Sequence, residues 1–222
     1  TLSRLPAVRS LDKNACPPLF RELLSANPFY SDVILTSPTG KVLASAWSTP
    51  SGLNLSDSPY FIEVLRTKAF AVGGFRKSRT TGINVLVCGY PVFGPQRELI
   101  GMVSTGLRLS IFDEIVRDVS LPAGSTISMA DRQGLRLFHR HFPDPKPDVY
   151  PVGEPLRAGI WKQLLEAPKG LPFFGIGADG MRRMYLIQES RLDPKAEPYL
   201  YVGVSLLEMN VLIQARRSLY SS

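Results

Sequence analysis

Features that would mark several classes of protein are scarce or missing in this sequence of 222 residues. No apolar run reaches the roughly 18–20 residues of a membrane-spanning helix, and no signal peptide opens the chain. The two cysteines, Cys16 and Cys88, are too few and too far apart for a disulfide framework or a zinc site. The two histidines, His139 and His141, have no third histidine to complete a metal site, and we interpret them as surface residues of a loop. We therefore expect no metal and no cofactor.

Motifs of catalysis are also missing. The sequence has no Gly-x-Ser-x-Gly elbow, no Walker loop and no His-Glu-x-x-His. The run Gly175-Ile-Gly177-Ala-Asp-Gly180 has the spacing of a dinucleotide fingerprint, but the following residues 181–187 have the pattern of a strand. The glycines therefore favour a hairpin turn. Cys88 lies in mid-strand without a recognisable base, so we expect an inert thiol and a chain that is not an enzyme.

What the sequence does have is an uneven positive charge. Its 26 Lys/Arg and 19 Asp/Glu give a net charge of +7. Residues 1–112 hold 12 basic and 6 acidic residues, a balance of +6, whereas residues 113–222 hold 14 and 13, a balance of +1. This modest excess comes without a known DNA-recognition helix or RNA-binding motif, so we do not expect nucleic-acid binding. Since the chain starts at Thr1 rather than Met, we expect it to be a piece of a longer protein.

Hydrophobic periodicity predicts the elements of the first half. Residues 8–24 have the spacing of a long lead-in helix, which Pro17 and Pro18 must kink or split. A hairpin follows at residues 30–46, then a short helix at residues 59–67. Three strands are predicted at residues 71–77, 84–92 and 99–109, and a closing helix at residues 111–119.

The second half repeats this order. Residues 126–138 align with residues 32–44 without a gap, with Gly134 on Gly40, and residues 200–206 correspond to residues 103–109. Between them we expect a helix near residues 160–166 and strands near residues 173–178 and 183–189. The final segment, residues 206–222, is amphipathic and predicted to be helical. The pattern favours a duplicated α+β fold, in which each half is an antiparallel sheet with flanking helices.

Aromatic and basic residues gather in residues 47–90. Apolar walls with a few convergent polar groups are typical of ligand pockets, and a guanidinium suits a carboxylate or phosphate. The alternative is that the aromatic residues belong to the core and the cations to a solvated strand face.

Several segments resemble the double Cache sensor domains, the extracytoplasmic ligand-binding modules of bacterial chemoreceptors, sensor histidine kinases and cyclic-di-GMP enzymes. The resemblance spans nearly the whole chain and rests on Asn54-Leu-Ser-Asp-Ser-Pro-Tyr-Phe61, Val72-Gly-Gly, Ser78-Arg-Thr-Thr-Gly82, Val85-Leu, Tyr90-Pro-Val92 and Leu99-Ile-Gly-Met-Val103.

This resemblance implies a long N-terminal helix at residues 1–27, a membrane-distal PAS-like ligand-binding module at residues 28–120 and a membrane-proximal PAS-like module at residues 121–205. A C-terminal helix at residues 206–222 would lead to a second membrane span. It implies a periplasmic sensor domain of an inner-membrane receptor, which binds a small molecule and can form a homodimer through the lead-in helix. The alternative function is a dimerisation or partner-binding module that takes no ligand.

The resemblance also locates the ligand site, with departures from the family pattern. Amino-acid-binding members carry Arg-x-Trp-Tyr where this chain has Ser58-Pro-Tyr-Phe61, Tyr-x-Asp where it has Arg76 and Ser78, and an aspartate where it has Gly106. With these acidic positions lost and a cation gained, we expect an organic acid rather than an α-amino acid. A register slip of one residue would turn Phe75 and Lys77 toward the pocket instead. The candidate ligand-binding residues are Trp47, Tyr60, Phe61, Phe75, Arg76, Lys77, Ser78, Cys88, Tyr90, Ser104 and Gly106.

Overall fold

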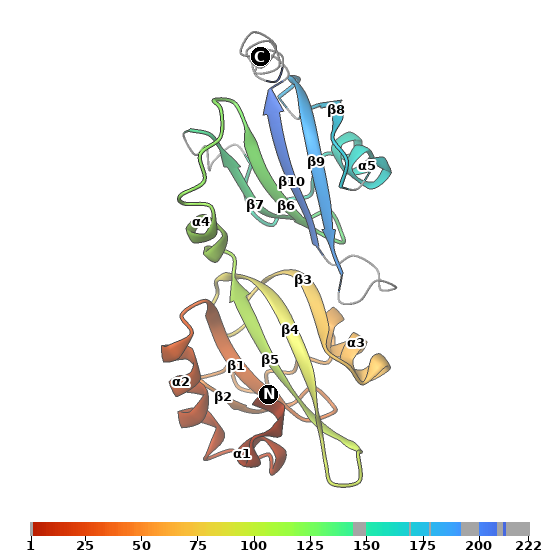
Figure 1. Cartoon of the computed structure of the whole chain (residues 1–222). Coiled ribbons are helices and arrows are strands. Elements are labelled where there is room, and N and C mark those ends of the chain that lie inside the picture. The colour runs from red at the N-terminus through yellow and green to blue at the C-terminus, as the bar shows by residue number, and fades with distance from the viewer. Residues whose placement is uncertain are drawn as a thin grey trace, which may run out of the picture. The chain divides into compact units, whose positions relative to one another are not determined.

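The computed structural model describes residues 2–143, 150–168, 170–177, 179–191, 200–207 and 211. The chain divides into two compact units, Thr1–Ile111 and Phe112–Ser222. Each unit contains one five-stranded antiparallel sheet (Figure 1). No helix in the described part of the chain is both long and apolar enough to cross a membrane.

The sheet of the first unit has the strand order β2-β1-β5-β4-β3. Its strands are β1 (Tyr30–Thr36), β2 (Val42–Ser45), β3 (Ala71–Lys77), β4 (Asn84–Phe93) and β5 (Leu99–Arg108). The helices are η1 (Leu2–Arg4), α1 (Pro6–Arg9), α2 (Cys16–Ala26) and α3 (Pro59–Thr67), and α4 (Ile111–Ile115) follows β5.

The sheet of the second unit repeats this order strand for strand, as β7-β6-β10-β9-β8. Its elements are β6 (Thr126–Asp131), β7 (Arg136–His141), α5 (Ala158–Glu166), β8 (Phe173–Ile176), β9 (Arg182–Ser190) and β10 (Leu200–Leu207). The α+β class and the duplicated architecture are therefore confirmed. The antiparallel pairing of β8 with β9 also confirms the hairpin at the glycine-rich turn.

The prediction of one long N-terminal helix is wrong, because α1 and α2 are separate and short. Leu11 adopts a left-handed conformation with φ 54° that ends the first helical segment. Asp12 Oδ1 then accepts the backbone N–H groups of Asn14 at 2.8 Å and Ala15 at 2.9 Å, which starts a new turn. Pro17 lies in the first turn of α2, where a missing N–H costs nothing.

The N-terminal helices cover one face of the first sheet, and α3 covers the other. On the first face, Phe20 of α2 is fully buried against Val33 and Leu35 of β1. On the opposite face, Phe61 of α3 packs with Met102 of β5. Because side chains alternate along a strand, neighbouring residues of β5 belong to different layers.

Two sequence expectations concern the second unit and the C-terminus. His139 and His141 lie in strand β7 rather than in a surface loop, and both are partly buried. The predicted C-terminal helix begins at Leu206, but Leu206 and Leu207 end strand β10. Residues 208–210 and 212–222 lie outside the described residues.

Candidate functional site

A small cavity lies in the first unit between the start of α3 and the sheet. Its volume is about 40 Å³. Strands β1, β3, β4 and β5, the start of α3 and the loop after β3 all contribute to its walls. The lining residues are Ser31, Asp32, Ile34, Leu55, Ser58, Tyr60, Arg76, Ser78, Arg79, Thr80, Val85, Val87, Ser104, Thr105 and Gly106.

Five of the eleven candidate residues line this cavity. They come from three elements and the start of a loop that are separate in the sequence, and strand pairing brings them together: Tyr60, Arg76, Ser78, Ser104 and Gly106. A side chain at Gly106 would not fit, because its Cβ would lie 2.6 Å from Ser31 Oγ.

The other candidate residues lie outside this lining. Trp47 is 45% exposed, and its Nε1 donates to the Ser31 carbonyl at 3.0 Å. Phe61 is fully buried in the core beneath α3. Cys88 and Tyr90 line a different hollow of about 400 Å³, next to Leu23 and Leu24 of α2. Burial raises the pKa of Cys88 to about 11, so it stays a neutral thiol at neutral pH.

Strand register determines which cation reaches the cavity. Arg76 pairs with Val85 across β3 and β4, and Val85 lines the cavity. Phe75 and Lys77, the residues on either side of Arg76, are not part of the lining. Since side chains alternate along a strand, Arg76 is the cation of β3 that lines this cavity and Lys77 is not.

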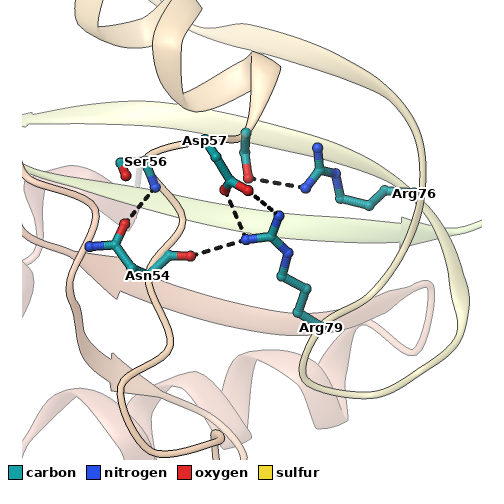
Figure 2. Close-up of polar contacts among 6 residues, drawn as sticks. Asn54, Ser56, Asp57, Arg76 and Arg79 are labelled. Carbon is teal, nitrogen blue, oxygen red and sulfur yellow. Dashed lines mark hydrogen bonds and ion pairs between the residues drawn. The ribbon is translucent and has the colours of Figure 1, made fainter.

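The two arginines of the cavity differ in their partners (Figure 2). Arg79 makes a bidentate ion pair with Asp57, with N–O distances of 2.6 and 2.8 Å, and also donates to the Asn54 carbonyl at 3.0 Å. Arg76 Nη1 donates to the Ser58 hydroxyl at 3.2 Å. Among the described residues, no carboxylate forms an ion pair with Arg76. Its charge is therefore the one that a ligand could neutralise.

Tyr60 and Ser104 add neutral hydroxyl groups to the cavity. Tyr60 is 3% exposed, and its hydroxyl lies 3.5 Å from Ser104 Oγ. Burial raises the pKa of Tyr60, so its hydroxyl keeps its proton and can donate a hydrogen bond.

Asp32 is a buried carboxylate of the lining that the sequence prediction missed. The residue is 2% exposed. Ser45 Oγ lies 3.1 Å from each carboxylate oxygen, and the Val33 N–H donates to Oδ1 at 2.7 Å. Burial raises the pKa of Asp32 against the opposing effect of these donors. The cavity therefore has a carboxylate of its own, at a position that the family pattern of acidic amine-binding residues does not indicate.

The sequence contains a signal that points to Asp32. It lies two residues before Ile34 on a strand whose other face carries Val33 and Leu35. The period of two therefore puts Asp32 and Ile34 on one side of the sheet, away from the N-terminal helices.

Known proteins similar to this chain were found by comparing structures. No family model and no curated protein matches the sequence. The extracellular domain of a protein described as the histidine kinase rpHK1S-Z16 is similar with a TM-score of 0.72 and 21% identity, over 92% of this chain and 84% of that one.

Two chemoreceptor domains are also similar. The ligand-binding domain of Pseudomonas fluorescens CtaA, solved with L-isoleucine, gives a TM-score of 0.62 and 16% identity over 94% of this chain and 78% of that one. The ligand-binding domain of Pseudomonas aeruginosa PAO1 PctC, solved with GABA, gives a TM-score of 0.62 and 17% identity over 92% of this chain and 84% of that one. The chain therefore has the fold of the extracellular ligand-binding domains of histidine kinases and chemoreceptors, as the resemblance to double Cache domains predicted.

Proposed function

We propose that this chain is the extracytoplasmic sensor domain of a bacterial transmembrane receptor and binds a small carboxylate in the cavity of its first unit. The receptor is a histidine kinase, a chemoreceptor or a cyclic-di-GMP enzyme, with the domain on the periplasmic side of the inner membrane. The observation that carries this proposal is Arg76, a cation of the cavity lining without an ion-pair partner among the described residues. The similarity to sensor domains supports it.

The chemistry of the lining suits a compact anion. A guanidinium binds a carboxylate through two parallel N–H donors, and the Tyr60 and Ser104 hydroxyls can bond its remaining lone pairs. The cavity of about 40 Å³ has room for about three water molecules, at roughly 10–15 Å³ each. The ligand is therefore small, or it widens the cavity on entry.

A simple organic acid is the first candidate ligand. The oxygens of Asp32 already accept hydrogen bonds from Ser45 and Val33, so they do not need a ligand amine as a donor. An amino carboxylate is the second candidate, since a buried carboxylate that forms no ion pair within the described structure attracts an ammonium group. L-Isoleucine and GABA, the ligands of the two chemoreceptor domains, belong to this second class.

The function requires binding and a shift of conformation, without turnover. A ligand that prefers one of two conformers shifts their equilibrium by its difference in affinity. In the receptor, the chain segments that leave the domain would carry this shift to the membrane.

A thermal-shift screen of the purified chain against organic acids, amino acids and GABA tests the proposal. A ligand at about 100 times its Kd stabilises the fold by ~2.7 kcal/mol. We expect a carboxylate to raise the Tm and Arg76→Gln to weaken its binding at least about tenfold. Lys77→Gln is the matched control, because it removes the neighbouring cation, which lies outside the cavity lining.

Three outcomes count against the proposal. Equal affinity in wild type and Arg76→Gln refutes the assignment of the cavity. If Lys77→Gln loses as much affinity for the carboxylate as Arg76→Gln, the effect comes from net charge rather than from the cavity. A screen without any hit favours the ligand-free dimerisation or partner-binding module.

A further inference from the structure

The second unit contains a larger cavity at the equivalent place. Its volume is about 110 Å³, and it lies between α5 and the sheet formed by β6, β7, β9 and β10. Gly203 of β10 lines it, and the internal alignment puts Gly203 on Gly106, which lines the cavity of the first unit. The duplication has thus kept a hollow on the same face of both sheets.

The walls of the second cavity are mostly aromatic and aliphatic. Phe173 stacks on Tyr185 with ring centroids 5.6 Å apart, and Tyr201, Ile160 and Ile187 complete an apolar enclosure. Apolar walls with few polar groups are typical of small-molecule sites.

Two buried arginines line this apolar cavity, and they differ in their partners. Arg183 is 4% exposed and pairs with Asp179 at 2.5 Å. Arg136 is 8% exposed, and its Nη1 donates to the Pro151 carbonyl at 3.3 Å. Its Nε is buried without a hydrogen-bond partner in the described structure. Among the described lining residues, Asp179 is the sole carboxylate, so Arg136 has no counter-charge in the cavity.

The other titratable groups near Arg136 do not supply that counter-charge. Glu154 attracts Arg136 from a distance without forming an ion pair. His139 Nδ1 lies 2.6 Å from Ser128 Oγ, and its Nε2 lies 3.1 Å from Nε2 of His141. Burial lowers the pKa of His139 to about 3, so it is neutral at neutral pH. A buried cation with an unsatisfied donor is costly, and an anion that meets it removes the cost.

We propose that the second unit is itself a ligand-binding module, which takes a monocarboxylate with a compact apolar body. The carboxylate meets Arg136, and the body fills the space among Tyr185, Tyr201 and Ile160. This site is separate from the first-unit cavity, since the two cavities share no lining residue.

Gly203 offers a substitution that fills the cavity without distorting the backbone. A Cβ built at Gly203 meets nothing closer than Ile187 Cγ1 at 3.8 Å, an ordinary contact. A valine there suits a strand and extends into the space that the ligand needs. Gly203→Val therefore tests occupancy of the cavity even if Arg136→Gln fails to fold.

Isothermal titration of the full chain with benzoate and isobutyrate tests the proposal, with benzyl alcohol as the uncharged probe. We expect at least one carboxylate to bind and benzyl alcohol to bind at least about tenfold more weakly. Gly203→Val and Arg136→Gln should each weaken the carboxylate at least about tenfold. Arg76→Gln, the variant that tests the first-unit site, should leave the affinity for this carboxylate unchanged.

The proposal is overturned if neither carboxylate binds, or if benzyl alcohol binds as tightly as benzoate. It is also overturned if Gly203→Val retains full affinity, or if Arg76→Gln abolishes binding of these probes. The last result would assign the probes to the first unit and would leave the first-unit proposal intact.

Discussion

His139 makes the stability of the second unit depend on pH. Its pKa is lowered from 6.5 to about 3 because the imidazole is buried beside His141, Arg136 and Arg183. Between these two pH values the unfolded chain binds a proton that the folded chain does not. The folded state therefore loses stability as the pH falls from about 6.5 toward about 3.

We expect His139→Phe to reduce this pH dependence. Phenylalanine keeps a ring next to Tyr150, which lies 4.4 Å from the His139 ring centroid, and cannot be protonated. The measurement is the free energy of unfolding in urea between about pH 7.5 and pH 4.5. The same loss of stability in wild type and variant over that range would contradict the assignment.

Asp32 has the opposite dependence, because burial raises the pKa of its carboxyl group. The folded chain holds a proton that the unfolded chain has released, so this residue favours folding at low pH and opposes it as the pH rises. Asparagine keeps the shape and removes the charge. We expect Asp32→Asn to be more stable than wild type near pH 7.5, with the gain disappearing toward about pH 4. A variant that is less stable than wild type at neutral pH would show that the hydrogen bonds from Ser45 outweigh the desolvation.

At the scale of elements, the N-terminal helices belong to the core of the first unit. Phe20 is fully buried among Val8, Val33 and Leu35. Truncation of a buried phenylalanine costs ~3–5 kcal/mol, so we expect Phe20→Ala to lower the free energy of unfolding by that amount. Ile62→Ala is the control, since Ile62 is 53% exposed and exposed substitutions change stability by roughly 0.5 kcal/mol or less. Equal losses in urea unfolding would mean that α2 is not part of this core.

Alternation and turn residues were enough to predict most strands. Residues 71–77 were expected as a strand and form β3, and residues 84–92 fall within β4. Periodicity could not predict the break between α1 and α2. It arises from one left-handed residue, Leu11, and from the side chain of Asp12, which caps the next turn.

The candidate site was only partly predictable, for a related reason. Arg76 and Tyr60 could be inferred from their places on a strand and at a helix start. Whether Arg76 or Lys77 meets the cavity depends on cross-strand register, which β3 fixes through an irregularity between Val72 and Phe75. Asp32 could have been inferred from the period of two on β1, although the pairing of β1 with β5 is irregular between Tyr30 and Val33.

At the scale of the whole molecule, the burial of the N-terminal segment changes the result that we expect from deleting it. If the lead-in helix formed a homodimer interface, deletion of residues 1–25 would abolish dimerisation and leave the rest folded. Because Val8, Cys16 and Phe20 are fully buried within the first unit, we expect this deletion to unfold that unit. Circular dichroism measures whether the deletion variant unfolds cooperatively, and sedimentation measures whether it is a monomer or a dimer. A deletion variant that keeps a cooperative unfolding transition of wild-type amplitude while becoming monomeric would contradict this expectation and restore the dimer interface.

The strand order has a mechanical consequence. In each sheet the third strand is central, and β5 both lines the first cavity, through Ser104 and Gly106, and continues directly into α4. Likewise β10 lines the second cavity and is the last described strand of the chain. In the first unit, the strand that lines the cavity is therefore also the one through which the chain continues to the second unit. A ligand that displaces β5 would therefore also displace the start of α4, which follows it in the chain.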